Sequence, residues 1–108
     1  MRIDIKKRRC VLANKQGGLS GPAVLPVALR MVYQVSGAVN IPVLGMGGIM
    51  TGADAIEFLM AGAAAVAIGT AALVDPTAPL RILDELKEFM HEHGYADIQS
   101  IREVRYEL

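Results

Sequence analysis

The sequence lacks several features that would assign it to a special class of protein. Cys10 is its only cysteine, so no disulfide can form within the chain, and this fits a reducing, cytoplasmic location. Its longest apolar stretches, such as residues 63–68, fall well short of the roughly 20 residues that a membrane-spanning helix needs. A signal-peptide pattern is also missing, because no apolar segment follows the charges of the N-terminal MRIDIKKRR.

An excess of charge of one sign is absent as well. The 108 residues include 11 Lys+Arg and 11 Asp+Glu, which gives a net charge of +0, and 53% are hydrophobic. The basic run at residues 6–9 has no aromatic or further basic patch to support it, so we interpret it as a solvated turn rather than a nucleic-acid or targeting signal. The composition is that of an ordinary soluble globular protein.

Turn-forming residues divide the first third of the chain. Residues 1–13 alternate weakly between apolar and polar around the basic run, which predicts a short hairpin or arm. Residues 14–22, NKQGGLSGP, predict a glycine-rich loop. Apolar residues then recur at helical spacing, which predicts a helix from about Pro22 or Pro26 to about Gly37, with proline in its first turn.

Two short apolar runs alternate with helical patterns in the rest of the chain. We expect strands at residues 41–44 and 64–68 and a last helix that Gly94 ends, with residues 95–108 forming a C-terminal tail that has one helical turn around 100–104. The helix between the strands should cover residues 53–61. Its predicted ends are a capping box of Thr51 with Asp54 and a C-cap at Gly62.

This order of elements indicates the fold class. Strands that are apolar on both faces and separated by helices belong to a parallel sheet covered by helices, an α/β fold. Residues 23–94 would form a helix-strand-helix-strand-helix unit, but two βα units are too few to close a barrel, which takes about eight units and roughly 250 residues. A two-stranded parallel sheet also leaves both edges unpaired. We therefore expect the C-terminal part of something larger.

Glycine turns follow both predicted strands. Gly47 and Gly48 come after the first strand, and Gly69 and Thr70 come after the second. Backbone N–H groups at the C-terminal ends of adjacent parallel strands converge on one volume, which suits an anion such as phosphate. A single Gly-Gly after a strand is as often a plain tight turn. Both turns together, in consecutive units, favour a phosphate site.

Other candidate residues support little chemistry. In GGLSGPA, Gly21 would let the backbone approach the same ligand, and Ser20 would serve as an N-cap for the following helix. His91 and His93 lie two positions apart on a helix and so face different ways, which gives no metal site. Cys10 has no histidine placed near it and is interpreted as a structural thiol. No catalytic residue and no metal ligand is therefore assigned.

Four stretches together resemble a known family: ANKQGGLSGPAVLPVALRMVYQV, IPVLGMGGI, AIEFLMAGAAAVAIGTA and the closing HGYADIQSI. They resemble the C-terminal part of dihydroorotate dehydrogenase over almost the whole chain. The likeness is greatest to the cytosolic, NAD-linked branch that works beside a subunit with FAD and an iron–sulfur cluster. GGLSGPA, GMGGI and GTA in this order are specific to that flavoprotein family, whereas the last two alone occur in many phosphate-binding barrels.

The resemblance implies a TIM (β/α)8 barrel that holds FMN at the C-terminal face of its strands. The implied FMN contacts in this sequence are Gly21, Gly47, Gly48, Gly69 and Thr70. The arm at residues 1–13 would follow the sixth strand, and the two apolar runs would be the seventh and eighth. The family's proton-abstracting base, its lysine near the flavin and its orotate-binding asparagines come from earlier in the barrel, and none is in this chain.

Three functions remain open from the sequence. The chain is expected to be part of a dehydrogenase that oxidises dihydroorotate to orotate in pyrimidine biosynthesis, with electrons passing through FMN towards NAD, and to be inactive alone. The alternative is a non-catalytic half-barrel that binds a phosphorylated ligand, associates with itself or assembles with the remainder of a barrel. A different phosphate-binding barrel enzyme, acting on a nucleotide or thiamine phosphate, is a third possibility that the GGLSGPA loop argues against.

Overall fold

A computed structural model describes all 108 residues. Its elements follow one another along the chain in the order β1 (Ile3–Asp4), β2 (Arg9–Cys10), η1 (Pro22–Val24), α1 (Leu25–Ala38), β3 (Leu44–Met46), α2 (Gly52–Met60), β4 (Ala65–Ala67), α3 (Thr70–Val74), α4 (Ala78–His93), α5 (Ile98–Glu103) and η2 (Val104–Glu107). No helix is both long enough and apolar enough to cross a membrane.

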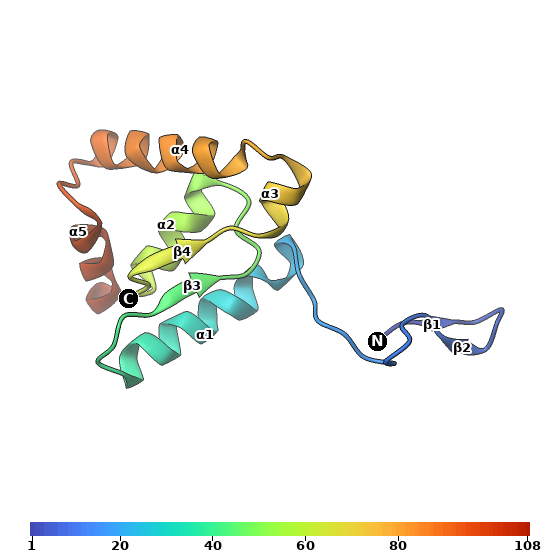
Figure 1. Cartoon of the computed structure of the whole chain (residues 1–108). Coiled ribbons are helices and arrows are strands. Elements are labelled where there is room, and N and C mark those ends of the chain that lie inside the picture. The colour runs from blue at the N-terminus through green and yellow to red at the C-terminus, as the bar shows by residue number, and fades with distance from the viewer.

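Strands β1 and β2 form an antiparallel hairpin that stands apart from the rest of the chain. Ile3 pairs with Cys10 and Asp4 pairs with Arg9. The turn between them contains Arg8 with a φ of 50°, and Asp4 Oδ1 accepts hydrogen bonds from the N–H groups of Lys6 and Lys7. In Figure 1 the hairpin projects from the body on an extended segment, so it forms an arm.

The body is built on a two-stranded parallel sheet. Leu44 pairs with Ala65, Gly45 with Val66 and Met46 with Ala67, which places the C-terminal ends of β3 and β4 side by side. Helices α1 and α2 pack against one face of this sheet, and α4 packs against α2 (Figure 1). The sheet has no third strand, so the structure is a small α/β unit with no closed barrel.

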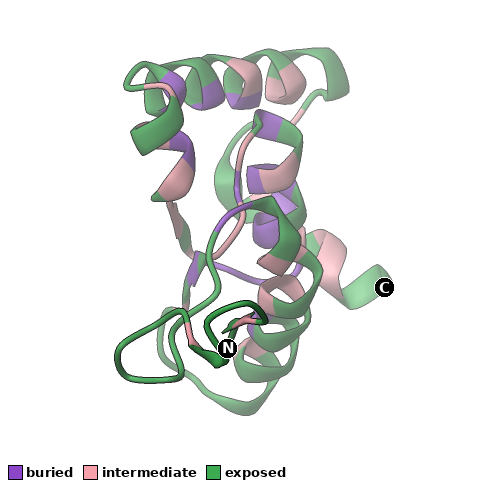
Figure 2. Cartoon of the chain, turned by 90° about the vertical axis from the view of Figure 1, so that its right-hand side faces the viewer, coloured by how far each residue is buried: buried purple, intermediate pink, exposed green.

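The core lies among the helices rather than between the strands. Phe58 of α2 and Ile82 of α4 belong to one buried cluster, and Leu59 and Ile101 belong to a second cluster beneath α5. Figure 2 shows the buried positions concentrated on α2 and on the inner side of α4. Only 17 of the 108 residues are buried, which is few for a chain of this length and reflects the open face of the sheet.

The strands differ from the sequence-based expectation in position and in burial. The first is Leu44–Met46 rather than 41–44, and the second is Ala65–Ala67 rather than 64–68. They are not covered on both faces, because Leu44 is 52% and Met46 56% exposed. An apolar run shows which residues avoid water, but the number of neighbours that can cover them depends on the rest of the sheet.

The helices follow the expected pattern with three corrections. Thr51 and Asp54 form the predicted capping box, but α2 has its C-cap at Ala61, and Gly62 follows it with a φ of 107°. Helix α3 was not predicted, since its five residues are too few for a periodic pattern. Ser20 caps no helix, because Gly21 precedes η1 and Val24 precedes α1 without a side-chain hydrogen bond. Gly94 ends α4, as predicted, and adopts the left-handed conformation.

Candidate functional site

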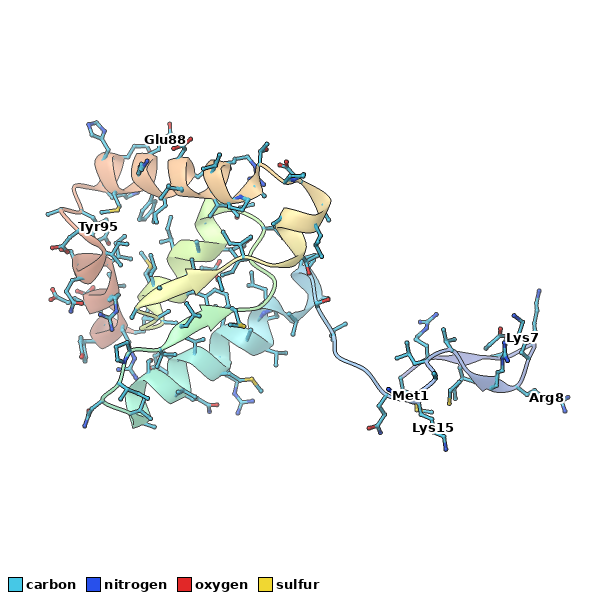
Figure 3. The ribbon with its side chains drawn as sticks, viewed as in Figure 1. Met1, Lys7, Arg8, Lys15, Glu88 and Tyr95 are labelled. Atoms are coloured by element: carbon cyan, nitrogen blue, oxygen red, sulfur yellow. The ribbon has the colours of Figure 1, made fainter.

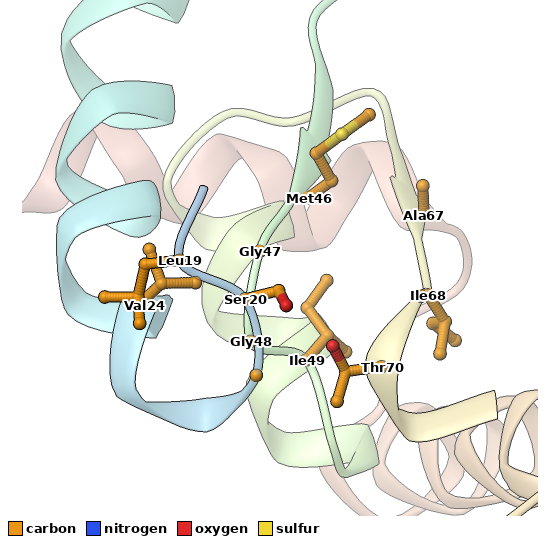
Figure 4. Close-up of a pocket in the computed structure, with 12 residues that line it drawn as sticks. Leu19, Ser20, Val24, Met46, Gly47, Gly48, Ile49, Ala67, Ile68 and Thr70 are labelled. Carbon is orange, nitrogen blue, oxygen red and sulfur yellow. The ribbon is translucent and has the colours of Figure 1, made fainter. Parts of the chain in front are cut away.

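A cavity of about 260 Å³ lies at the C-terminal ends of β3 and β4. Three segments line it, as Figure 4 shows: the loop that enters η1, the turn after β3 and the turn after β4. Parallel pairing of the two strands brings their turns together, and the helix that precedes β3 carries the glycine-rich loop to the same edge. The cavity is therefore a product of the βα topology.

All five residues that the sequence indicated for a phosphate site line this cavity: Gly21, Gly47, Gly48, Gly69 and Thr70. A methyl carbon built on Gly21 would lie 3.7 Å from Thr70 Cγ2, so the loop and the turn after β4 are in contact range. A methyl carbon built on Gly48 would lie 2.9 Å from the Gly21 carbonyl oxygen. Residues separated by up to 49 positions along the sequence thus surround one volume.

The glycines in the turn after β3 are required by helix α1. Gly47 has a φ of 121° and Gly48 a φ of 80°, a region that side chains other than glycine rarely adopt. A Cβ on Gly47 would lie 2.7 Å from Ala28 Cβ, and one on Gly48 would lie 2.8 Å from the Leu25 backbone nitrogen. Both contacts are too short, so these two positions let the turn pass close to η1 and α1.

Gly69 is different from the other cavity glycines. Its φ of −113° is negative, and a Cβ built on it meets no atom within 4 Å. Nothing in the protein itself therefore excludes a side chain at this position. Gly69 also lines the cavity, so a ligand group there could approach its backbone closely.

Hydrogen-bond donors without partners surround the cavity. Four of its residues have backbone N–H groups that donate no hydrogen bond within the chain: Gly47, Gly48, Gly69 and Thr70. The hydroxyls of Ser36, Thr77 and Ser100 donate within the chain, whereas those of Ser20 and Thr70 do not. Donors of this kind bind an anion or water, because an unpaired polar group is costly.

Charged side chains lie behind the turn rather than in the cavity. Asp54 Oδ2 accepts hydrogen bonds from the N–H groups of Met50 and Thr51, each at 2.9 Å. Arg81 Nη2 donates to the Met50 carbonyl at 3.1 Å, and Glu85 Oε2 accepts the Gly52 N–H. These contacts fix residues 50–52, directly after the glycine turn.

The electrostatics of this network favour ionised carboxylates. The Gly52 N–H, and after it the Arg81 guanidinium, hold the pKa of Glu85 below its ordinary value of 4.5. Hydrogen bonds from the Thr77 hydroxyl and N–H lower the pKa of Asp75, to which Arg81 adds a smaller contribution. Both carboxylates therefore remain charged at neutral pH and can hold Arg81 in place.

Sequence reasoning missed two parts of this site. Ser20 was interpreted as a helix cap, but it lines the cavity together with Thr70 (Figure 4). The Arg81–Glu85 pair has the i,i+4 spacing of a helix-surface ion pair, which the sequence could have indicated. The contact of this pair with residues 50–52 could not be predicted from sequence spacing, because the two segments are about 30 positions apart.

Three other residues contribute nothing to the cavity. Gly45 lies inside β3, where a Cβ would clash with the ring of Phe58, so its small size serves the packing of α2 on the sheet. His93 Nδ1 lies 3.0 Å from the Phe89 carbonyl oxygen at the end of α4. Cys10 is in the arm, and no group of three His, Cys, Asp or Glu residues is placed to hold a metal ion.

The sequence is similar to those of known proteins. The sequence model of the family described as "Dihydroorotate dehydrogenase" matches residues 1–90. Two curated relatives are catalytic subunits of dihydroorotate dehydrogenase B (NAD(+)), and each match covers 94% of this chain. The subunit from Alkaliphilus metalliredigens is 53% identical over 102 residues, and that from Geobacter sulfurreducens is 57% identical over 101 residues. The chain spans about one third of the length of these relatives, 34% and 33% respectively.

The fold is similar to solved structures of the same name. DHODH from Eimeria tenella in complex with ferulenol superimposes with a TM-score of 0.77 at 28% identity, covering 86% of this chain and 26% of that one. The ligand-free form from the same organism gives a TM-score of 0.76. The family match over most of the chain, the high identity to the relatives and the shared fold agree: the chain belongs to the dihydroorotate dehydrogenase family.

Proposed function

We propose that this chain forms the part of a dihydroorotate dehydrogenase that binds the phosphate of FMN. The observation that carries the proposal is the cavity at the ends of β3 and β4, where backbone N–H groups from two glycine turns have no partner within the chain. Gly21, Gly47, Gly48, Gly69 and Thr70 would contact the phosphate. In this assignment β3 and β4 are the seventh and eighth strands of a TIM barrel.

The residues present fit a phosphate group rather than a whole flavin. Three or more donors around a cavity of about 260 Å³ match the oxygens of a phosphate, and the open space at Gly69 admits one close to the backbone. Thr70 and Ser20 add hydroxyl donors from two different segments, the turn after β4 and the loop that enters η1. No charged side chain lines the cavity, so backbone and hydroxyl groups would provide the binding.

The proposed whole protein oxidises dihydroorotate to orotate in the cytoplasm, as part of pyrimidine biosynthesis. FMN supplies the hydride acceptor when bound, and its electrons would go towards NAD through a partner subunit with FAD and an iron–sulfur cluster. This chain's own contribution is to orient the cofactor by its phosphate. The family resemblance implies that the proton-abstracting base comes from outside the chain, and no acid or base side chain lines the cavity.

A flavin absorption spectrum tests the proposal. The purified chain is mixed with FMN or with riboflavin, which has the same ring system but no phosphate, and is separated from free flavin before the spectrum is taken. We expect the chain to retain FMN in preference to riboflavin, and to turn over no dihydroorotate by itself. Equal retention of the two flavins would contradict the phosphate site, and turnover by the isolated chain would contradict the assignment of the base to another segment.

A second candidate is a non-catalytic module that binds another phosphorylated ligand. The same free N–H groups favour it, because they recognise a phosphate and not the molecule attached to it. A competition experiment with inorganic phosphate, thiamine phosphate and a nucleoside monophosphate against FMN separates the two. Displacement of FMN by equimolar amounts of any of these would favour the module.

A further inference from the structure

Arg81 connects the two segments that leave the cavity. Its Nη2 donates to the Met50 carbonyl at 3.1 Å, and its Nε lies 3.9 Å from Asp75 Oδ2. Met50 comes two residues after Gly48, in the turn that follows β3. Asp75 comes directly after α3, whose first residue is Thr70, and its N–H donates to the Ala71 carbonyl at 2.8 Å. One guanidinium therefore bridges the exits from both glycine turns.

Glu85 fixes the orientation of this guanidinium. Arg81 Nη1 donates to Glu85 Oε1 at 2.8 Å, while Glu85 Oε2 accepts the N–H of Gly52. Arg81 thus donates hydrogen bonds from two of its nitrogens, while Nε lies within ion-pair distance of Asp75. A lysine ammonium lacks the planar fork that this arrangement uses. We call Arg81, Asp75, Glu85 and the backbone of residues 50–52 the Arg81 bracket.

We propose that Arg81 is a positioning residue that holds the two glycine turns at the separation at which one phosphate group can accept hydrogen bonds from both. The proposal rests on the phosphate site proposed above. Hydrogen bonds from N–H to oxygen require about 2.7–3.2 Å, so a displacement of one turn by 1 Å would remove its donors from reach. The bracket connects both turns behind the cavity and does not contact the ligand itself.

Stability alone is a weak explanation for the bracket. The side chain of Arg81 is 43% exposed and that of Glu85 37%, and exposed ion pairs contribute little to the free energy of folding. An ordinary surface pair on α4 would need no contact with Met50. Its loss should therefore alter the geometry of the turns more than the stability of the fold.

The test compares Arg81→Gln with a control on the same helix. Glu88→Gln also changes a charged residue of α4, but the side chain of Glu88 makes no hydrogen bond or ion pair and projects from the body in Figure 3. Dissociation constants of the full 108-residue chain are measured for FMN and for riboflavin, together with the melting temperature. Arg81→Lys, which keeps the charge but loses the planar fork, serves as the conservative variant.

We expect Arg81→Gln to raise the dissociation constant for FMN by about threefold to tenfold, which is the effect of losing one hydrogen bond. The constant for riboflavin should stay unchanged, as should both constants in Glu88→Gln. Arg81→Lys should fall between Arg81→Gln and the wild type.

Three results would overturn the inference. FMN binding by Arg81→Gln equal to that of the wild type would do so while leaving the proposed function intact. Equal weakening of FMN and riboflavin would show a general structural role. A wild-type chain that binds FMN no more tightly than riboflavin would overturn the proposed function, and the inference with it.

Discussion

Gly47 and Gly69 line the same cavity but are glycines for different physical reasons. At Gly47 the positive φ and the closeness of Ala28 require the missing side chain, whereas at Gly69 neither condition holds. Substitutions at the two positions should therefore separate the stability of the turn from the space available to a ligand.

Gly69→Ala should weaken ligand binding without weakening the fold. The added methyl group meets no protein atom within 4 Å, and it would stand between the Gly69 backbone and a ligand that approaches it in the cavity. We expect the dissociation constant for FMN to rise and the melting temperature to stay within about 1 °C of the wild type. Gly18→Ala is the matched control, because Gly18 also has no atom within 4 Å of a built Cβ but lies outside the cavity lining. A Gly69→Ala chain that binds FMN normally would remove Gly69 from the site.

Gly47→Val should weaken both the fold and the retention of FMN. A Cβ at this position lies 2.7 Å from Ala28 Cβ and forces a side chain into a φ of 121°, at a cost of about 1–3 kcal/mol. The turn must then move away from α1 and take its N–H groups with it. Thermal unfolding and flavin content after purification measure the two effects, and unchanged flavin content would count against the account.

The sequence predicted the residues of the cavity better than their individual roles. Glycine at the ends of two apolar runs was enough to indicate Gly47, Gly48, Gly69 and Thr70. The sequence alone indicated a phosphate site at Gly47, but the structure shows that a Cβ at this position would point towards Ala28. The direction of this Cβ depends on which helix packs against the turn, and the order of residues in the sequence does not contain that information. The part of these residues in FMN binding stays a prediction.

At the scale of elements, the contact between the start of α2 and the side of α4 positions the turn after β3. Asp54, a residue of α2, accepts the N–H of the N-cap residue Thr51, and Glu85 of α4 accepts the N–H of Gly52. The capping box was visible in the sequence because its two residues are three positions apart. The contact from α4 was not, since it depends on how the helices pack.

The Glu85 contact should make stability depend on pH in a defined direction. Its pKa is lowered in the folded chain, so the contact stabilises the fold fully above the unfolded value of about 4.5 and loses this effect as the pH falls through the lowered folded value. We expect the wild type to exceed Glu85→Gln in free energy of unfolding at pH 7, with the difference shrinking below about pH 4.5.

Urea unfolding of both chains between pH 3 and pH 7 measures this difference. Glu88→Gln removes a carboxylate from the same helix that makes no hydrogen bond, so it corrects for the change in net charge. A difference between wild type and Glu85→Gln that stays constant over this range would contradict the assignment.

Secondary structure was predictable where local rules dominate. The helix ends at Thr51 and Gly94 follow from capping residues, and α1 follows from helical spacing behind proline. The strand positions were displaced by one to three residues, because strand bounds depend on pairing with a neighbour. The short α3 was not predicted either, because its five residues between the turn after β4 and Asp75 are too few for a periodic pattern.

At the scale of the whole molecule, the open face and edge of the sheet are its most unusual property. Leu44 and Met46 face solvent. They line a groove of about 250 Å³ whose other residues are also hydrophobic and belong to α1, such as Met31, or come directly before β3. Unpaired strand edges next to apolar surface tend to associate with another chain. In the proposed whole protein, the rest of a barrel would cover this surface.

The isolated chain should therefore self-associate through this groove. Met31 is 59% exposed within it, and Met31→Glu places a charge there that association would have to bury. We expect sedimentation velocity to show concentration-dependent association of the wild type and a shift of Met31→Glu towards monomer. Gln34→Glu adds the same charge to α1 outside the groove lining and should behave as the wild type. A wild-type chain that stays monomeric at all concentrations would contradict self-association through this groove.

The central claim is that two glycine turns together hold one phosphate group, and an NMR titration tests it most directly. FMN is added to the uniformly ¹⁵N-labelled chain, and each backbone amide resonance is followed. We expect the amides of Gly47, Gly48, Gly69 and Thr70 to shift together along one saturation curve, and riboflavin not to reproduce these shifts. Shifts confined to one turn, or absent from both while FMN binds elsewhere, would contradict it.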